Sequence, residues 1–424
     1  MSANYVSNKL GFADSKLINQ FALDPNSPRL LEAFADYLEA LCGKRKIVVV
    51  DLFCGGGGFT TGAIQAGAVV ALSIDLWEPA EKVHHENHPT VPFIKMALGD
   101  IEADVQLILE YIQPYVEMGY HFHLHGSPPC QAISTASRRH NSEGMPMVMH
   151  YLELVDRLEP DSWSMENVPP VRKLLPEYIP AVMLNSAEFG VAQQRRRCFA
   201  GEGWEVTRTH SNHNLKGNKN KHLPNFRTVL DALPHLREEY IELLKSYDSS
   251  LLGAPLELWD KVIQLASGTI DLLINTAGGG ASDGKRVTSV DTLVSEPCKT
   301  IHNNIPSIRV REDSSIDMTL NNAGVADSNS QRALSSEVSV EQPSNTITGK
   351  GVTLRTNIGD GVNYRKVRSL TIDEMATLQD FPTDYSFDAA KFKKDRYLVV
   401  GNAVCPAVAK AVIEGIKIGG NDDV

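Results

Sequence analysis

The segment KIVVVDLFCGGGGF, residues 46–59, decides the fold of this chain. Its first part, Lys46–Asp51, is a short apolar run rich in β-branched residues, which predicts a buried strand. The glycines that follow, Gly55–Gly58, allow backbone N–H groups to approach a ligand at the start of a helix, as in nucleotide-binding α/β folds. The loop has neither the G-x-G-x-x-G spacing of a dinucleotide site nor the Gly-Lys-Ser/Thr of a P-loop, so a triphosphate is not the expected ligand.

Downstream of this loop, as far as residue 201, short apolar runs alternate with amphipathic stretches, which is typical of an α/β fold with a parallel sheet. Beyond residue 201 the periodicity is poor, and we expect mostly irregular structure there. Strands are expected at Val69–Asp75, Phe122–His125, Ser162–Glu166, Ala181–Ala187 and Cys198–Gly201, and helices at Arg29–Leu41, Ile101–Gln113, Met147–Leu158, about Thr228–Leu265, Leu370–Leu378 and Ala407–Gly415.

Three acidic residues, Asp51, Asp75 and Asp100, lie at expected strand ends near the glycine loop. In open α/β folds an acid after the second strand binds ribose hydroxyls, and Asp100 could accept a hydrogen bond from a base amine. Each acid alone is more often a helix cap or a surface charge than a ligand-binding group. Together with the glycine loop, they favour an adenosine-bearing cofactor.

One cysteine follows a diproline in the segment GSPPCQ, Gly126–Gln131. The two prolines fix φ and prevent a helix from starting at once, so the preceding strand ends sharply. A free cysteine is often a small buried hydrophobe, which is the alternative interpretation. The rigid strand exit indicates instead that the Cys130 thiol is presented for chemistry.

Two further groups of polar residues follow along the chain. Glu166 ends a strand before a second diproline, and the carboxyl ends of parallel strands meet at one edge, so Glu166 and Cys130 should face one site. A buried carboxyl needs a partner or stays protonated. Gln193, Arg195 and Arg197 alternate along an extended segment and should therefore share a face. A salt-bridged edge strand is the alternative for that segment.

Length, net charge and cysteine content limit the classes of protein to which this chain can belong. The 424 residues exceed one typical domain and suggest two lobes, and the formal net charge of -11 argues mildly against a nucleic-acid partner. Residues 195–221 nevertheless form a basic strip suited to phosphates, although a solvated loop explains that charge equally well. The six cysteines include no C-x-x-C pair, so neither a zinc site nor a disulfide framework is indicated. No signal peptide or membrane span is apparent, and we expect a cytoplasmic protein.

With these residues in view, the chain resembles the DNA (cytosine-5) methyltransferase family, whose motifs occur here in the family's order. The resemblance covers about Lys46–Gly201 and Pro343–Gly415. The chain departs from the family at Asp75–Trp77, where Glu and an aromatic residue are usual, and at Ala192 and Cys405, where proline is usual. The matching segments are 51–59, 99–101, 126–131, 166–168, 193–197, 368–382 and 401–404.

The resemblance implies a Rossmann-like S-adenosylmethionine-dependent methyltransferase fold with a smaller, irregular target-recognition domain. Residues 1–45 would form a helical extension, 46–202 and 342–424 the catalytic and cofactor-binding domain, and 203–341 the target-recognition domain. No metal is required. The implied catalytic residues are Cys130, Glu166, Arg195, Arg197 and Gln131; the cofactor contacts are Asp51, Phe53, Gly55, Gly57, Gly58, Asp75, Leu76, Trp77, Asp100, Ile101, Pro129, Asn402, Ala403 and Val404; and the DNA contacts are Ser134, Asn167, Val168 and Gln193.

The resemblance also implies a reaction. The Cys130 thiolate would add to C6 of a flipped-out cytosine while a protonated Glu166 binds N3 and Arg195 holds O2. The methyl group of S-adenosylmethionine would then pass to C5, leaving S-adenosylhomocysteine, with the segment 132–144 closing over the base. Duplex DNA and a cognate restriction endonuclease are the implied partners of a monomeric enzyme. One alternative is an RNA methyltransferase. The RNA-acting branch of the family usually has a smaller variable region than residues 203–341 of this chain, which favours DNA. The other alternative is a non-catalytic DNA-binding homologue. The presence of Cys130, Glu166 and Arg195 argues against it, because a homologue without activity usually loses such residues first.

Overall fold

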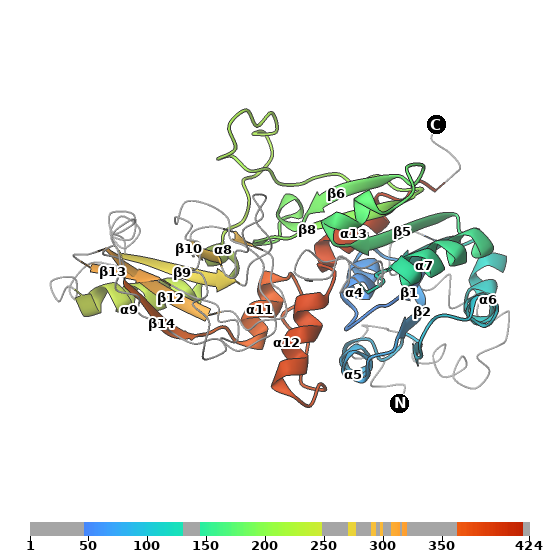
Figure 1. Ribbon diagram of the computed structural model, residues 1–424, viewed down its shortest axis with the longest axis horizontal. Helices are drawn as coiled ribbons and strands as arrows, with labels where there is room; N and C mark the ends of the chain where they lie inside the picture. The colour runs from blue at the N-terminus through green and yellow to red at the C-terminus, as the bar shows by residue number, and fades with distance from the viewer. Residues whose placement is uncertain are drawn as a thin grey trace, which may run out of the picture.

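The protein is described by a computed structural model over residues 46–129, 145–247, 270–276, 290–293, 297–299, 307–313, 316–319 and 363–418. Figure 1 shows a larger lobe around one sheet and a smaller lobe around another, with α11 and α12 between them. The helix expected at Arg29–Leu41 lies outside the described residues. The helices are α4 (Gly58–Gln65), α5 (Glu78–Asn87), α6 (Ile101–Glu117), α7 (Met145–Leu158), α8 (Val229–Ala232), α9 (His235–Tyr247), α11 (Ile372–Leu378), α12 (Lys393–Asn402) and α13 (Pro406–Glu414).

A seven-stranded sheet forms the centre of the larger lobe, in the order β3-β2-β1-β4-β5-β8-β6. Neighbours from β3 to β5 pair in parallel, and β8 runs antiparallel to both β5 and β6. The chain crosses from β3 back to β4 on the other side of β1, so the strand order switches between β1 and β4, where open α/β sheets bind ligands. The strands are β1 (Ile47–Leu52), β2 (Val69–Asp75), β3 (Phe93–Lys95), β4 (His121–Gly126), β5 (Ser162–Asn167), β6 (Ala181–Asn185) and β8 (Arg196–Glu202).

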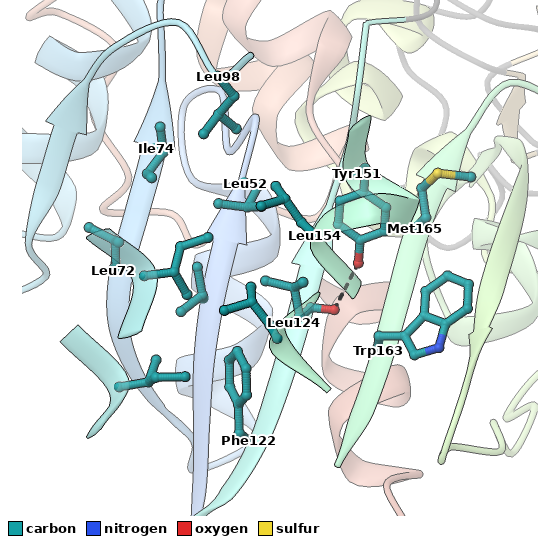
Figure 2. Close-up of a cluster of buried hydrophobic side chains, with 14 of the residues drawn as sticks. Leu52, Leu72, Ile74, Leu98, Phe122, Leu124, Tyr151, Leu154, Trp163 and Met165 are labelled. Atoms are coloured by element: carbon teal, nitrogen blue, oxygen red, sulfur yellow. Dashed lines mark hydrogen bonds between the residues drawn. The ribbon is translucent and has the colours of Figure 1, made fainter. Parts of the chain in front are cut away.

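Helices cover both faces of this sheet and thereby bury its central strands on both sides. On one face, α6 and α7 pack against Leu52, Leu124 and their neighbours (Figure 2), and the Tyr151 hydroxyl donates to the Leu124 carbonyl oxygen at 3.0 Å. On the other face, α4 and α13 cover Ile47 and Val49. Helix α13 thereby brings the C-terminal part of the chain onto the larger lobe.

The smaller lobe contains an antiparallel sheet where the sequence predicted irregular structure. Strands β10, β9, β12 and β13 are adjacent in that order, and β14 pairs with β12. These strands are short, most do not alternate strictly between apolar and polar residues, and they lie among Gly- and Ser-rich stretches, so their two-residue periodicity is weak. Strand β14 lies beyond residue 341 yet belongs to this sheet. Its strands are β9 (Ile270–Thr276), β10 (Val290–Leu293), β12 (Ser307–Asp313), β13 (Ile316–Thr319) and β14 (Asn363–Ser369).

An ionic network ties α9, α11 and β14 together. The Arg368 guanidinium contacts Glu239 at 2.5 Å and Glu374 at 2.6 Å, and His235 contacts Glu374 at 2.7 Å. His235, Glu239 and Glu374 lie close enough together to hold a metal ion. Because the Arg368 guanidinium already pairs with both carboxylates, we interpret this cluster as an internal ion-pair network.

The regular elements predicted between residues 46 and 202 are confirmed, with boundaries shifted by a few residues. Helix α6 continues to Glu117, and β5 extends to Asn167. The one difference in conformation lies at the end of Ala181–Ala187. There β6 ends at Asn185, whose side chain accepts a hydrogen bond from the Ala187 N–H and forms a capping box that starts the 3₁₀ helix η3 (Ser186–Phe189).

One stretch of the described residues, Lys393–Glu414, is long and apolar enough to cross a membrane by length and composition alone. It is divided into α12 and α13, which are separated at Ala403–Cys405, and 67% of its apolar 18-residue window is buried within the fold. Core helices of this kind meet the same criterion, so the stretch is only weak support for a membrane span.

Shortening Leu124 to alanine tests the core between the sheet and α7. Leu124 is completely buried, so Leu124→Ala should lower the free energy of unfolding by about 2–5 kcal/mol through reduced burial and a residual cavity. Leu215→Ala is the matched control, because Leu215 is 61% exposed and its removal should change stability by less than about 0.5 kcal/mol. Chemical denaturation of both variants measures the difference, and equal destabilisation would contradict the assignment of this core.

Candidate active site

The glycine loop between β1 and α4 is shaped by close contacts with the C-terminal motif. Gly57 is the N-cap of α4 and has φ of 87°, a conformation that favours glycine. At Gly58 a Cβ atom would lie 2.3 Å from the Val404 carbonyl oxygen, so only glycine allows this approach. Two predicted cofactor motifs, far apart in sequence, therefore meet at one end of α4.

Two of the predicted acids hold this loop in place. The Oδ2 atom of Asp51 accepts hydrogen bonds from the backbone N–H (3.1 Å) and hydroxyl (2.7 Å) of Thr60, and the Asp75 carboxylate accepts from the backbone N–H groups of Gly55 and Trp77, both at 2.8 Å. Burial raises the pKa of Asp51 to about 7 and also raises that of Asp75, although hydrogen bonds oppose both shifts. Both carboxylates therefore order the backbone of the loop.

Other predicted cofactor contacts lie around the same end of the sheet. Leu76 follows β2 and is 65% exposed, which leaves an apolar side chain free to meet a flat ligand such as adenine. Trp77 and Ile101 are half-buried. Asp100 is the N-cap of α6 and accepts a hydrogen bond from Ala103 N–H, so its structural role as a helix cap is established.

The strand that precedes the predicted nucleophile is tied to β5. Asn167, at the end of β5, is buried and donates its side-chain amide to the Pro128 carbonyl oxygen at 3.1 Å. It therefore holds the start of the diproline segment beside the end of β5, and its predicted contact with DNA stays a prediction, as does that of the half-buried Val168. Exposed Pro129 follows at the edge of the described residues. The predicted residues Cys130, Gln131 and Ser134 lie outside them.

Glu166 and the arginine motif lie together, as the family resemblance implied. The Nε atom of Arg197 contacts the Glu166 carboxylate at 2.9 Å, and both side chains are about nine-tenths buried. This ion pair is the partner that a buried carboxyl requires. Arg196 is exposed, whereas Gln193 and Arg195 are buried, so alternation along this segment is confirmed. One small cavity is lined by Glu166, Arg195, Arg197, Leu184, Ser186, Phe199, Val404, Cys405 and Val408.

The arginine motif also anchors the C-terminal motif. Arg195 donates to the Gly401 carbonyl oxygen at 2.9 Å, and the fully buried Gln193 amide donates to the Gln379 side chain at 2.8 Å. Gln379 in turn donates to the Ala403 carbonyl oxygen at 3.0 Å. In this arrangement Gln193 positions other residues, and its predicted DNA contact remains a prediction. Asn402 is exposed beside the glycine loop, whereas Ala403 and Val404 are buried.

Sequence reasoning missed a serine that holds the arginine motif. The Ser186 hydroxyl accepts from the Arg195 backbone N–H at 3.0 Å and donates to the Gln193 carbonyl oxygen at 2.5 Å. A lone serine inside a predicted strand carries no signal for this role, because the contact depends on the turn after β6.

Comparison with known proteins assigns the chain to a family. Residues 47–175 and 178–418 match the model of the family described as C-5 cytosine-specific DNA methylase. Type II methyltransferase M1.HphI of Haemophilus parahaemolyticus is 23% identical over 393 residues, covering 87% of this chain and 86% of the relative. Type II methyltransferase M.HindV of Haemophilus influenzae is 24% identical over 368 residues, covering 87% of this chain and 95% of the relative.

A third relative aligns over a shorter stretch. Type II methyltransferase M.HgiDI of Herpetosiphon aurantiacus is 29% identical over 163 residues, which cover 35% of this chain, and the chain spans half the length of that relative. The family match, in contrast, extends from β1 to the end of the described C-terminal segment. The chain therefore belongs to the C-5 cytosine-specific DNA methylase family.

Proposed function

We propose that the protein transfers a methyl group from S-adenosylmethionine to C5 of cytosine in a specific duplex DNA sequence. The observation that carries this proposal is the convergence of Glu166, Arg195 and Arg197 on one cavity. These groups lie at the carboxyl end of β5, beside the strand that leads into Cys130. A carboxyl and two guanidinium groups in one crevice are suited to binding the polar edge of a pyrimidine.

The glycine loop fits the proposed cofactor. The buried Oδ1 atom of Asp51 has no hydrogen-bond partner among the described residues, and a side chain at Gly55 would enter open space. Asp51, Gly55, Asp75 and exposed Leu76 would hold the amino-acid, ribose and adenine parts. When bound, S-adenosylmethionine supplies an electrophilic methyl group.

The residues of the chain then account for activation of the base. C5 of cytosine is a weak nucleophile, so the Cys130 thiolate adds to C6 and makes the ring enamine-like. Glu166 takes up a proton and donates it toward N3, which stabilises the charge that moves into the ring, while Arg195 holds O2. After methylation, loss of the C5 proton and breakage of the C6–S bond release Cys130. The base must leave the duplex, at a cost of a few kcal/mol.

The proposal divides the chain as the sequence suggested. Residues 46–202 and 342–424 would bind the cofactor and carry the chemistry, residues 203–341 would recognise the target, and residues 1–45 would form a helical extension. Strand β14 would be shared, because it pairs with the smaller sheet while its chain continues into the catalytic lobe. We further propose a cytoplasmic monomer that acts with a cognate endonuclease.

A basic loop is the proposed site of phosphate contact. Residues 211–226 carry three exposed lysines and no acidic residue. Ser211 closes the loop by donating its N–H to the Pro224 carbonyl oxygen at 2.9 Å and accepting from Phe226 N–H at 3.2 Å. In Figure 1 the segment between β8 and α8 extends away from the body of the larger lobe. An ordered, exposed, basic loop of this kind is suited to the DNA backbone.

Replacing Lys216, Lys219 and Lys221 with alanine should weaken binding to all DNA sequences similarly. The slope of log affinity against log salt should fall by about 0.9 for each phosphate that the variant no longer neutralises. A triple Lys→Arg variant is the matched control, because it retains the charge and should retain the slope. Titrations of DNA affinity against salt make the comparison, and an unchanged slope in the alanine variant would show that this loop is only solvated.

One experiment tests the proposed function. The protein is incubated with methyl-labelled S-adenosylmethionine and, separately, genomic DNA and tRNA, and labelled DNA is then sequenced after bisulfite treatment. We expect label in DNA at cytosines of one sequence context. Label in tRNA alone would identify an RNA methyltransferase, and no label in either would support a non-catalytic homologue; either result overturns the proposal.

A further inference from the structure

Six side chains form a continuous hydrogen-bonded ladder across β4 and β5. The ladder consists of histidines from β4, serines from β5 and, at its end, Ser127, which follows β4. It is unbroken from the amino end of β4 to the start of the diproline segment. The bonds join His121 Nε2 to Ser162 Oγ (2.8 Å), Ser162 Oγ to His123 Nδ1 (2.7 Å), His123 Nε2 to Ser164 Oγ (2.9 Å), Ser164 Oγ to His125 Nδ1 (2.8 Å) and His125 Nε2 to Ser127 Oγ (3.0 Å).

The chemistry of the alternating groups allows this ladder to carry a proton. A neutral imidazole has one N–H donor and one acceptor nitrogen, and a hydroxyl donates one hydrogen bond while accepting another. Every bond can therefore be made with all donors pointing toward Ser127, or with all pointing toward His121. Burial keeps the inner imidazoles neutral, because it lowers the pKa of His123 to about 3 and that of His125 well below its usual value. A proton that enters at one end can thus leave at the other while each group passes one proton on.

The middle of the ladder is shielded from water. His123 and His125 are completely buried, and the Phe59 ring stacks on His125 with ring centroids 3.4 Å apart and planes within 3°. His121 and Ser127, at the two ends, are partly exposed. Protons can therefore enter or leave at the ends and cannot exchange freely along the side.

The strand register brings the ladder to Glu166. His123 is paired with Ser162 and His125 with Ser164, so the next facing positions are Ser127 and Glu166. Since side chains alternate along a strand, Glu166 lies on the same face as Ser162 and Ser164. The backbones of neighbouring strands are about 4.8 Å apart, so side chains at these two facing positions can reach one another directly or through one water.

We propose that this His–Ser ladder is a proton relay between solvent at His121 and the Glu166 carboxyl. The proposal rests on the proposed function, in which Glu166 must donate a proton toward cytosine N3 although it lies in an ion pair with Arg197. One proton enters at His121, each ladder group passes one proton to its neighbour, and Ser127 delivers one to Glu166. When Cys130 is released, the proton returns by the reverse sequence, so no electrons are transferred and no charge remains in the ladder.

Ser164→Ala interrupts the relay at its centre without removing any group that touches substrate. Single-turnover methylation should slow by about 10-fold or more, with unchanged affinity for S-adenosylmethionine, because the proton that Glu166 must take up in that turnover reaches it more slowly. The parent protein should show a solvent deuterium isotope effect on this step that depends on several protons, and the variant should lose that multi-proton dependence. If the variant methylates DNA at the rate of the parent protein and shows the same solvent isotope effect, the relay is wrong.

Two further variants separate a relay from a structural role. Ser162→Ala breaks the ladder at another rung, and a series relay requires the same kinetic change. Ser73→Ala is the matched control, since Ser73 is a buried serine of β2 that bonds to His84 outside the ladder; it should lower stability while the isotope effect is retained. If Ser73→Ala changes the isotope effect as much as the ladder variants do, the relay is wrong.

A measurement without methyl transfer distinguishes failure of the relay from failure of the proposed function. Nitrogen-15 NMR of the parent protein should show His123 and His125 neutral at pH 7 and exchanging tautomers together, and Ser164→Ala should uncouple them. Independent, fixed tautomers in the parent would overturn the relay even if DNA is methylated. Coupled tautomers in a protein that methylates no cytosine would leave the ladder established while the proposed function fails.

Discussion

Cys130→Ser is expected to abolish methyl transfer while S-adenosylmethionine affinity changes by no more than a few-fold. The serine hydroxyl is far less nucleophilic than a thiolate and cannot add to C6 at a useful rate. The proposed cofactor contacts of the glycine loop and of β2 do not involve the thiol. Incorporation of labelled methyl groups into DNA measures the first effect, and calorimetric titration measures the second.

Cys198→Ser is the matched control for this substitution. Cys198 lies in β8 and is buried in the hydrophobic cluster between the larger sheet and helices α6 and α7. Burial raises the pKa of its thiol to about 11, so the thiol stays protonated at neutral pH. This variant should still methylate DNA. Substantial turnover by Cys130→Ser, or its absence in a folded Cys198→Ser variant, would refute Cys130 as the nucleophile.

Glu166→Gln should slow formation of the covalent adduct by about 10²-fold or more while the fold is kept. Glutamine has nearly the same shape, but it can neither pair as an anion with Arg197 nor transfer a proton toward N3, so acid and electrostatic assistance disappear together. DNA with 5-fluorocytosine at the target provides the measurement, because fluorine cannot leave C5 as a proton does and the adduct accumulates. Its rate of appearance on denaturing gels is compared with that of the parent.

Glu188→Gln is a geometrically matched control. Glu188 pairs with the Nε atom of Arg208 at 3.0 Å, much as Glu166 pairs with Arg197, but this pair lies outside the cavity lined by the arginine motif. Its removal should affect stability slightly and adduct formation little. Equal adduct rates for Glu166→Gln and the parent would remove Glu166 from the chemistry.

The sequence by itself determined the α/β lobe and the place of the proposed site within it. Apolar runs such as Ile47–Leu52 and the glycine and proline residues after them are local signals, because strand burial and turn geometry depend on neighbouring residues. Since parallel strands bring their carboxyl ends to one edge, even the convergence of Glu166 with the diproline segment followed from the strand order. The alternation that buries Gln193 and Arg195 is equally local.

Only the tertiary structure decided how these groups are partnered. The Arg197 contact with Glu166 requires β8 to run antiparallel beside β5, and the Gln193 contact with Gln379 joins positions 186 residues apart. Strand β14 joins the smaller sheet through pairing with β12, which its own sequence does not specify. The His–Ser ladder depends on the register of β4 against β5, and a shift of one residue would turn the serines to the other face. Register and long-range packing are properties of the assembled fold, so one segment's sequence cannot reveal them.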